Sequence, residues 1–376
     1  MFMIDIVPVE HSLWQNLYCA LLYTFMLCVG YTANMFIHSR GKYTHYISTI
    51  TLSIGLFIGC LSFFANDDFF HYYATTKKIS MHGPNVGIES FYQYLIFFTH
   101  HNYLLFRLFI WGPACILLYL TFRRFKINTN HAYFLLVTCY FITFTYARAS
   151  LAMSVFFYGL SCIYYPLFNK RWTKIAGLAI LLCSPIFHKS MYLLITIWLC
   201  SLFLKLNKKT IAIIILSTPV IFIASKLFIP YIIEHFVEDK ETLAKIGTYS
   251  ILVRESQNWK GILQNVIQYA TYYLPLYFLI YSFSNENIRS KCPTAVYNLY
   301  KLVFLIVLAG SILYFIIPTN NVLFYRTLFM SMIPITIIFT YAVDEKIIKF
   351  SNYRIVVWCG ITYTYLFLIY TIISTL

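Results

Sequence analysis

The sequence predicts an all-α polytopic membrane protein, with about twelve transmembrane helices in a single integral membrane domain over residues 1–376. Hydrophobic residues make up 60% of the chain and charged residues 11%, whereas a soluble globular protein carries about 25% charged residues. The mean hydropathy is +0.71. Apolar runs long enough to cross a bilayer recur along the whole chain, and basic residues cluster in the connectors between them.

The predicted spans suit a hydrocarbon core about 30 Å thick. They are 17–37, 47–65, 103–122, 131–147, 149–168, 175–187, 190–204, 210–229, 262–283, 299–317, 325–342 and 355–374. The run 175–187 is short and contains Pro185, so we expect a tilted or broken helix there. The segment 88–100 is too short to span and alternates apolar with polar residues, so we expect an amphipathic helix in the outer interface.

The basic residues of the connectors predict the orientation, because cytoplasmic connectors carry an excess of Lys and Arg. One alternating set, which includes "RRFKINTN" (123–130) and "NKRWTK" (169–174), holds sixteen of the 28 Lys and Arg but only three of the thirteen acids. We interpret its charges as orientation signals and place it in the cytoplasm. The two longest connectors, 66–102 and 230–261, and both termini then lie outside. The loop 230–261 mixes both charge signs with helix formers, which favours an ordered cap over the outer face, with a mobile loop as the alternative.

Charge and cysteine content exclude several other classes of protein. The net charge is +15, but no compact basic domain is present, so we expect no nucleic-acid partner. Nine of the ten cysteines lie in apolar runs and no CxxC motif occurs, which predicts free thiols rather than a disulfide network or a zinc site. The first sixteen residues contain two acids and no Lys or Arg, so we expect the first hydrophobic run to be a retained helix.

Arg148 is the one formally charged residue between His131 and Phe168. In the middle of a single spanning helix, an arginine would cost about 2.5–3.5 kcal/mol on insertion scales. The orientation instead divides this run into two helices and places Arg148 at a tight outer hairpin. The insertion cost then largely disappears, but the cation departs from the trend of positive charge on the inner side.

Five polar features from distant parts of the chain fall at the outer ends of predicted spans: "NDDFFHYY" (66–73), "IES" (88–90), Arg148, "FHKS" (187–190) and "FYRT" (324–327). Each also has a structural interpretation. The acids of 66–73 suit a solvated helix end, and the acid of 88–90 suits a helix start. The histidine suits an interface, the lysine beside it a snorkelling side chain, and the arginines suit ion pairs between helices.

Two arginines, a histidine and several acids at one lipid-accessible surface together indicate transfer between lipid-linked phosphates. A pyrophosphate leaving group gains negative charge as its bond to a sugar breaks, and the planar guanidinium of arginine binds phosphate oxygens bidentately. Such charge stabilisation is commonly the largest catalytic term. A carboxylate or a histidine near the acceptor hydroxyl can remove its proton. The sequence contains no Gly-rich phosphate loop, which favours a donor already activated on a lipid.

At these residues the sequence resembles the EpsG-like branch of the Wzy-type polysaccharide polymerases. The family pattern D-[YF]-x-x-Y is matched by "DFFHY", from Asp68 to Tyr72, and the family's helix-start acid by "ESF" at Glu89. The family element R-Q-x-[LI]-A is present as "RASLA" from Arg148. Ala149 replaces its glutamine, so any amide contact made there in relatives is lost.

Two further elements complete the series. "FHKS" (187–190) matches the family element F-H-x-S, and Arg326 corresponds to a late arginine before a penultimate helix. The order and spacing of the motifs match over residues 66–204, and the later region matches only in general terms.

The resemblance implies a GT-C-like fold in the bacterial inner membrane, with an active site at the periplasmic face and no cofactor or metal. The implied reaction moves the growing glycan from undecaprenyl pyrophosphate onto the non-reducing end of a new lipid-linked repeat unit, forming O-antigen or capsular polysaccharide. The expected partners are the undecaprenyl-pyrophosphate-linked repeat units, the lipid bilayer and a chain-length regulator protein.

By analogy with the family, one group of side chains positions or deprotonates the acceptor hydroxyl, and a second group binds the substrate. The catalytic candidates are Asp68, Glu89 and His188. The substrate-binding candidates are Arg148 and Arg326, which would hold pyrophosphate, with Tyr72 and Lys189.

Two other functions stay open. A flippase for the same lipid-linked sugars would need ionisable groups near the middle of the membrane, but Arg107 lies near the outer end of its predicted span and Lys301 near the inner end of another. Another outer-face transferase, such as an O-antigen ligase or a membrane acyltransferase, would use the same Arg and His chemistry. Only the motif series argues against it.

Overall fold

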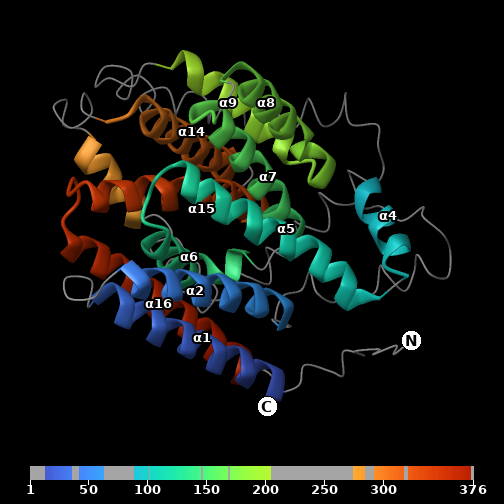
Figure 1. The fold of residues 1–376 in the computed structure, drawn as a ribbon, viewed down its shortest axis with the longest axis vertical. Helices are drawn as coiled ribbons and strands as arrows, with labels where there is room; N and C mark the ends of the chain where they lie inside the picture. The colour runs from blue at the N-terminus through green and yellow to red at the C-terminus, as the bar shows by residue number, and fades with distance from the viewer. Residues whose placement is uncertain are drawn as a thin grey trace. The chain divides into compact units, whose positions relative to one another are not determined.

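The structure is a computed structural model that describes residues 13–35, 42–62, 89–100, 102–144, 147–167, 170–204, 274–283, 292–316 and 321–373. All regular secondary structure in these ranges is helical (Figure 1). The helices are α1 (Leu13–Met35), α2 (Lys42–Ser62), α4 (Ser90–Phe98), α5 (Tyr103–Arg124), α6 (Thr129–Phe144), α7 (Ala147–Tyr164), α8 (Lys170–Phe187), α9 (Met191–Phe203), α14 (Thr294–Ile316), α15 (Asn321–Asp344) and α16 (Phe350–Ile373). Residues Leu274–Phe283 are also helical. The all-α prediction is confirmed for this part of the chain.

Most predicted spans coincide with these helices. The run 210–229 lies outside the described residues, and the run 262–283 is described only from residue 274. Within the described ranges, one helix, Leu104–Arg124, is both long enough and apolar enough to cross a membrane. The apolar parts of the other apolar helices are 10–17 residues long. The number of spans and the GT-C likeness therefore stay predictions.

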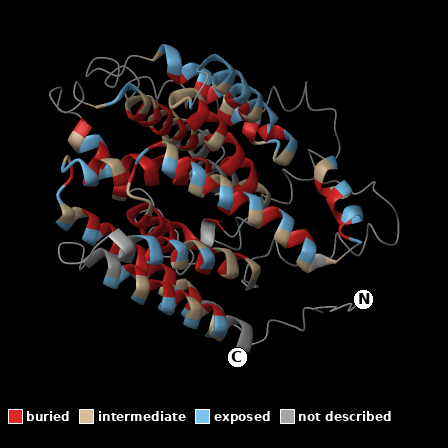
Figure 2. Ribbon diagram, viewed as in Figure 1, coloured by how far each residue is buried: buried red, intermediate tan, exposed pale blue. Residues whose placement is uncertain are grey.

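The chain divides into two compact units, Met1–Tyr192 with Thr336–Leu376, and Leu193–Ile335. In the first unit, α7 packs mainly against α8 and α5, whereas α6 packs mainly against α16 and α2. Almost every described side chain of α6 is buried, because this helix packs against α1, α2 and α16 (Figure 2). The second unit contains α14, most of α9 and the first part of α15.

The start of α6 is held by an acid from the end of α15. Asp344 Oδ1 lies 2.8 Å from His131 Nδ1, and the backbone N–H of Asn128 donates to Asp344 Oδ2 at 2.9 Å. A carboxylate is favoured at a helix N-terminus, where backbone N–H groups lack partners within the helix. Tyr353 Oη of α16 donates to the carbonyl oxygen of His131 at 3.1 Å. Asp344, which lies in a predicted connector, therefore joins the end of α15 to the start of α6, and Tyr353 joins α16 to the same place.

Arg107 is a buried cation with a structural explanation. Only 4% of its surface is exposed, and its guanidinium donates to the carbonyl oxygens of Cys60 and Leu61 in the last turn of α2. The last carbonyl groups of a helix lack partners within the helix and carry partial negative charge, so a cation is favoured there. Arg107 thus joins α5 to the end of α2. These contacts explain the buried charge of Arg107 without a transport pathway.

The helix α8 is continuous, so a break at Pro185 is wrong, whereas the alternative expectation of a tilted helix stays a prediction. The helix starts at Lys170 and includes Pro185 in its last turn. Proline has no backbone N–H to donate to the carbonyl four residues earlier, which belongs to Leu181. Ser184 Oγ donates to that carbonyl oxygen at 2.7 Å instead. The serine replaces the missing donor and allows the helix to reach Phe187.

The helices α7 and α8 approach most closely at two glycines. A Cβ atom on Gly159 would lie 2.6 Å from the carbonyl oxygen of Gly177 and 2.7 Å from the backbone nitrogen of Leu181. A Cβ on Gly177 would lie 2.7 Å from both Cys162 Cβ and the carbonyl oxygen of Gly159. Small residues allow helices in lipid to pack backbone against backbone. This contact fixes the relation between Arg148, at the start of α7, and the end of α8.

Candidate active site

Arg148 and Glu89 form an ion pair. Arg148 Nη1 donates to Glu89 Oε2 at 2.5 Å, although the residues are 59 positions apart in the sequence. The two side chains are 21% and 12% exposed, so water reaches both only in part. Charge-assisted hydrogen bonds of this kind are shorter and stronger than neutral ones. The structure thus brings together two of the predicted site residues.

Two hydrogen bonds stabilise the break between α6 and α7, just before Arg148. The helix α6 ends at Phe144 and α7 begins at Ala147, so the prediction of two helices within 131–168 is confirmed. The carbonyl oxygen of Phe144 accepts from Ser150 Oγ at 2.7 Å and from Trp111 Nε1 at 3.4 Å. These two donors satisfy a carbonyl group that the end of a helix leaves without a partner. Arg148 consequently lies in the first turn of α7.

Glu89 occupies the N-cap position of α4, so the predicted short helix in 88–100 is confirmed, whereas its place in the membrane interface stays a prediction. The side chain of Glu89 makes no cap hydrogen bond. Its carboxylate binds Arg148 instead. Tyr92, three residues later, is buried, and its ring centre lies 6.0 Å from Arg148 Cζ, within the range of a cation–π contact. A helix-start role alone does not account for this arrangement.

Tyr92 is a site residue that the motifs did not indicate. Its spacing of three residues from Glu89 was the available signal, because residues i and i+3 of a helix lie on one face.

His188 lies between α8 and α9, and Ser190 fixes the orientation of its ring. The backbone N–H of Ser190 donates to His188 Nδ1 at 3.1 Å, and Ser190 Oγ lies 2.6 Å from the same nitrogen. A backbone N–H can only donate, so Nδ1 accepts, and the neutral ring carries its proton on Nε2. The neighbouring Phe187 contacts Phe91 of α4, with ring centres 4.7 Å apart. This contact brings the histidine end of α8 against the helix that Glu89 begins.

The pKa of Glu89 lies below its ordinary value. Partial burial by itself raises this pKa, but the charge of Arg148 acts in the opposite direction. The backbone N–H of Glu89 and the hydrogen bond from Arg148 also lower it, so the pKa lies below its ordinary value despite the burial. Glu89 is therefore ionised at neutral pH and is a weak base.

Acidification is expected to weaken the Arg148–Glu89 pair, because the pair requires the carboxylate form. Since the folded-state pKa is lowered, the contribution to stability is complete above the ordinary glutamate pKa, about 4.3, and is lost as the pH falls through the lower folded-state value. The melting temperature of the purified protein should therefore fall more steeply between about pH 5 and about pH 3 than that of Glu89→Gln. Parallel curves for the two proteins would contradict this.

The remaining predicted site residues are placed less completely. Asp68 and Tyr72 lie outside the described residues, so their roles stay predictions. Lys189 is exposed in the turn between α8 and α9. Arg326 lies inside α15, in its second turn, and not before the helix as the resemblance implied. Among the described residues, no three His, Cys, Asp or Glu side chains are grouped to hold a metal ion.

Comparison with known proteins supports the family resemblance. A model described as the EpsG family matches residues 45–376, which confirms the resemblance to that family, whereas the roles of the single motif residues stay predictions. No curated protein and no solved structure matches the chain.

Proposed function

We propose, since the chain belongs to the EpsG family, that it polymerises undecaprenyl-pyrophosphate-linked oligosaccharide repeat units into O-antigen or capsular polysaccharide at the periplasmic face of the inner membrane. The family includes Wzy-type polymerase-like proteins and relates the chain to membrane polysaccharide biosynthesis. The observation that carries the proposal is the Arg148–Glu89 pair beside His188, because it joins three separate family motifs in one place.

In this mechanism Arg148 stabilises the leaving group. The bond between the donor sugar and its pyrophosphate breaks, the acceptor hydroxyl oxygen forms the new glycosidic bond, and the hydroxyl proton passes to a base. The pyrophosphate takes the bonding electron pair, so its negative charge rises where a guanidinium can bind two of its oxygens. Before substrate arrives, Glu89 neutralises and orients Arg148, since a partly buried cation without a counter-charge is costly.

The geometry bears on two of the three candidate bases, Glu89 and His188. Glu89 is engaged by Arg148 and has a lowered pKa, so it holds a proton poorly. Neutral His188 has its proton on Nε2, which suits it to donate to an anionic phosphate oxygen, while Ser190 binds its other nitrogen. We therefore propose Asp68 in the motif "DFFHY", which lies outside the described residues, as the general base.

Deletion of the gene in the producing strain tests the reaction class. A strain without its polymerase is expected to show lipid A-core carrying a single repeat unit when the surface polysaccharide is separated on a gel. Complete loss of repeats from the core, with lipid-linked units retained, would replace the proposal with a flippase or an O-antigen ligase. A plasmid copy of the wild-type gene provides the control, because it should restore the full ladder.

A further inference from the structure

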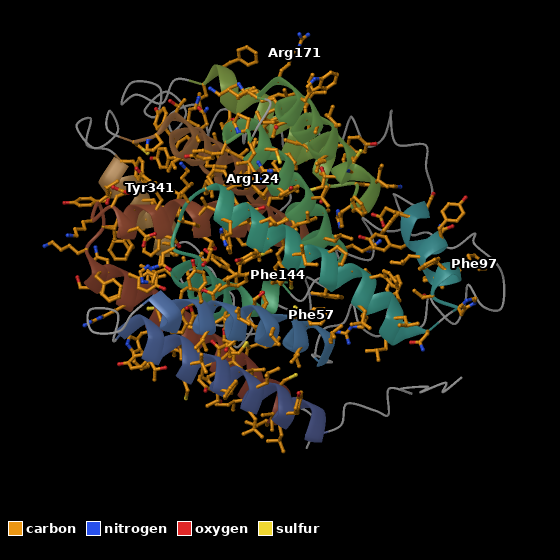
Figure 3. All side chains as sticks on the ribbon, viewed as in Figure 1. Phe57, Phe97, Arg124, Phe144, Arg171 and Tyr341 are labelled. Atoms are coloured by element: carbon orange, nitrogen blue, oxygen red, sulfur yellow. The ribbon has the colours of Figure 1, made fainter. Side chains whose placement is uncertain are left out.

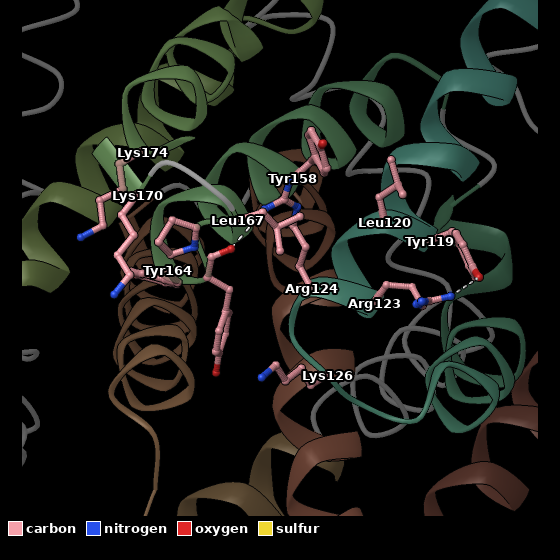
Figure 4. A pocket seen from close by; sticks show the side chains of 12 residues that line it. Tyr119, Leu120, Arg123, Arg124, Lys126, Tyr158, Tyr164, Leu167, Lys170 and Lys174 are labelled. Carbon is pink, nitrogen blue, oxygen red and sulfur yellow. Dashed lines mark hydrogen bonds between the residues drawn. The ribbon is translucent and has the colours of Figure 1, made fainter. Parts of the chain in front are cut away.

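A cavity with basic and aromatic side chains in its lining lies in the first unit, between α5, α7, the start of α8 and the chain that joins them (Figure 4). Its volume is about 800 Å³. The residues that line it are Tyr119, Leu120, Arg123, Arg124, Lys126, Tyr158, Tyr164, Tyr165, Pro166, Leu167, Lys170 and Lys174. Five of these twelve residues are basic and none is acidic. A cavity with this composition favours an anion.

Contacts with tyrosines hold the two arginines of the cavity in place. Arg124 donates to the carbonyl oxygen of Tyr165 at 3.1 Å, and its guanidinium lies 5.4 Å from the centre of the Tyr158 ring. Arg123 donates to Tyr119 Oη at 3.0 Å. Neither contact neutralises the charge of an arginine, because each partner is an uncharged group. The guanidinium groups thus remain positive and partly ordered before any ligand binds.

Lys126 has a backbone conformation that lysine rarely adopts. Its φ angle is +57°, directly after the end of α5, where glycine is the usual residue. The left-handed conformation costs a residue with a side chain about 1–2 kcal/mol. Strained residues cluster at binding sites, and here the strained residue contributes one of the five positive charges of the cavity.

The position of the cavity indicates a lipid ligand. It lies at the Arg124 end of Leu104–Arg124, the helix whose length and composition suit a membrane span among those described. Leu120 and Leu167 on its wall are 37% and 50% exposed. Basic and aromatic side chains beside an exposed apolar wall are typical of the membrane interface, where basic pockets bind acidic lipid headgroups. A soluble anion would bind the basic side chains alone, whereas a lipid can also contact the exposed Leu120 and Leu167.

We propose that this cavity binds the phosphate of an anionic lipid headgroup. The basic side chains that would bind it come from the connector 123–130 (Arg123, Arg124 and Lys126) and from the connector 169–174 (Lys170 and Lys174). The two connectors were predicted only to orient the chain. In the structure they form a single binding site, which the polymerase proposal neither requires nor uses. The predicted orientation places the site on the cytoplasmic side.

Native mass spectrometry of the full-length protein in detergent tests the proposal, with phosphatidylglycerol and phosphatidylcholine as the added lipids. The variants are Arg124→Gln and Lys126→Gly. The control is Arg171→Gln, because Arg171 does not line the cavity and its side chain extends away from the protein at the start of α8 (Figure 3). Wild type and control should retain phosphatidylglycerol in preference to phosphatidylcholine. Each cavity variant should reduce that retention about fivefold, the factor for about 1 kcal/mol per basic residue near a membrane surface.

Lys126→Gly keeps the test independent of folding. Glycine relieves the strain at φ +57°, so this variant should melt at the wild-type temperature or above it while it loses lipid. Wild-type retention by Lys126→Gly and Arg124→Gln would overturn the proposal, and so would equal retention of the two lipids by the wild type. Displacement of phosphatidylglycerol by an equal concentration of soluble glycerol 1-phosphate would overturn the lipid assignment in favour of a free phosphate compound.

Discussion

Arg148→Ala is expected to abolish visible polymer and to lower the rate of glycan transfer about 10²–10³-fold, the usual effect of removing one preorganised donor to a developing oxyanion. The alanine leaves the negative charge of the departing pyrophosphate without its bidentate partner. It also leaves Glu89 partly buried without a counter-charge, because Arg148 Nη1 is the group that binds its carboxylate at 2.5 Å. The measurement is the surface polysaccharide ladder in a deletion strain that carries the variant on a plasmid, together with transfer by the purified protein.

Arg148→Lys separates charge from geometry. Lysine keeps the positive charge but lacks the planar fork, so it can bind pyrophosphate only as a point charge. We expect a residual ladder of low intensity, between wild type and Arg148→Ala. Glu89→Gln should also give an intermediate ladder, because it removes the group that orients Arg148 and leaves the arginine present.

Expression and folding are the controls for these variants. Arg171→Ala removes an exposed arginine outside the candidate site and should give the wild-type ladder. A normal ladder from Arg148→Ala at wild-type abundance would reduce Arg148 to a structural partner of Glu89. In that outcome the deletion phenotype could still identify a polymerase, but the phosphate-holding role of Arg148 would be wrong.

The sequence predicted the helices from local apolar length and the break before Arg148 from the orientation of the chain. Apolar length marks a helix, and the alternation of basic connectors along the chain divides the long run 131–168 into two helices. The partner of Arg148 could not be predicted in this way. Several acids occupy the outer ends of the predicted spans, and the choice of Glu89 depends on how α4 lies against α8, where Phe91 meets Phe187.

Other features needed the three-dimensional structure because they join segments with no shared pattern. The helix α8 remains intact at Pro185 because Ser184, one residue earlier, can reach the carbonyl oxygen of Leu181 that proline leaves without its usual donor, a detail of rotamer and distance. The basic cavity combines two connectors that look in the sequence like ordinary orientation signals. The strain at Lys126 is a backbone property that composition does not report.

Gly177→Ala and Gly159→Ala are each expected to destabilise the protein and to reduce polymer formation. In most helices, replacing glycine by alanine stabilises by about 0.5–1 kcal/mol through helix propensity. Here the new methyl group would lie 2.6–2.7 Å from backbone atoms of the facing helix, closer than carbon atoms approach. Backbone cannot move aside as a flexible side chain can, so α7 and α8 must separate, and overpacking of this kind costs about 1–3 kcal/mol.

The same substitution at Gly112 provides the matched control, because a Cβ atom there would have no neighbour within 4 Å. Gly112→Ala should raise the melting temperature of the purified protein or leave it unchanged, whereas the two interface variants should lower it. The interface variants should also weaken the polysaccharide ladder, since separation of α7 from α8 moves Arg148 relative to His188. Equal melting temperatures for Gly112→Ala and Gly177→Ala would show that the two helices do not depend on this contact. A full ladder from a destabilised Gly177→Ala would show that the site tolerates the movement.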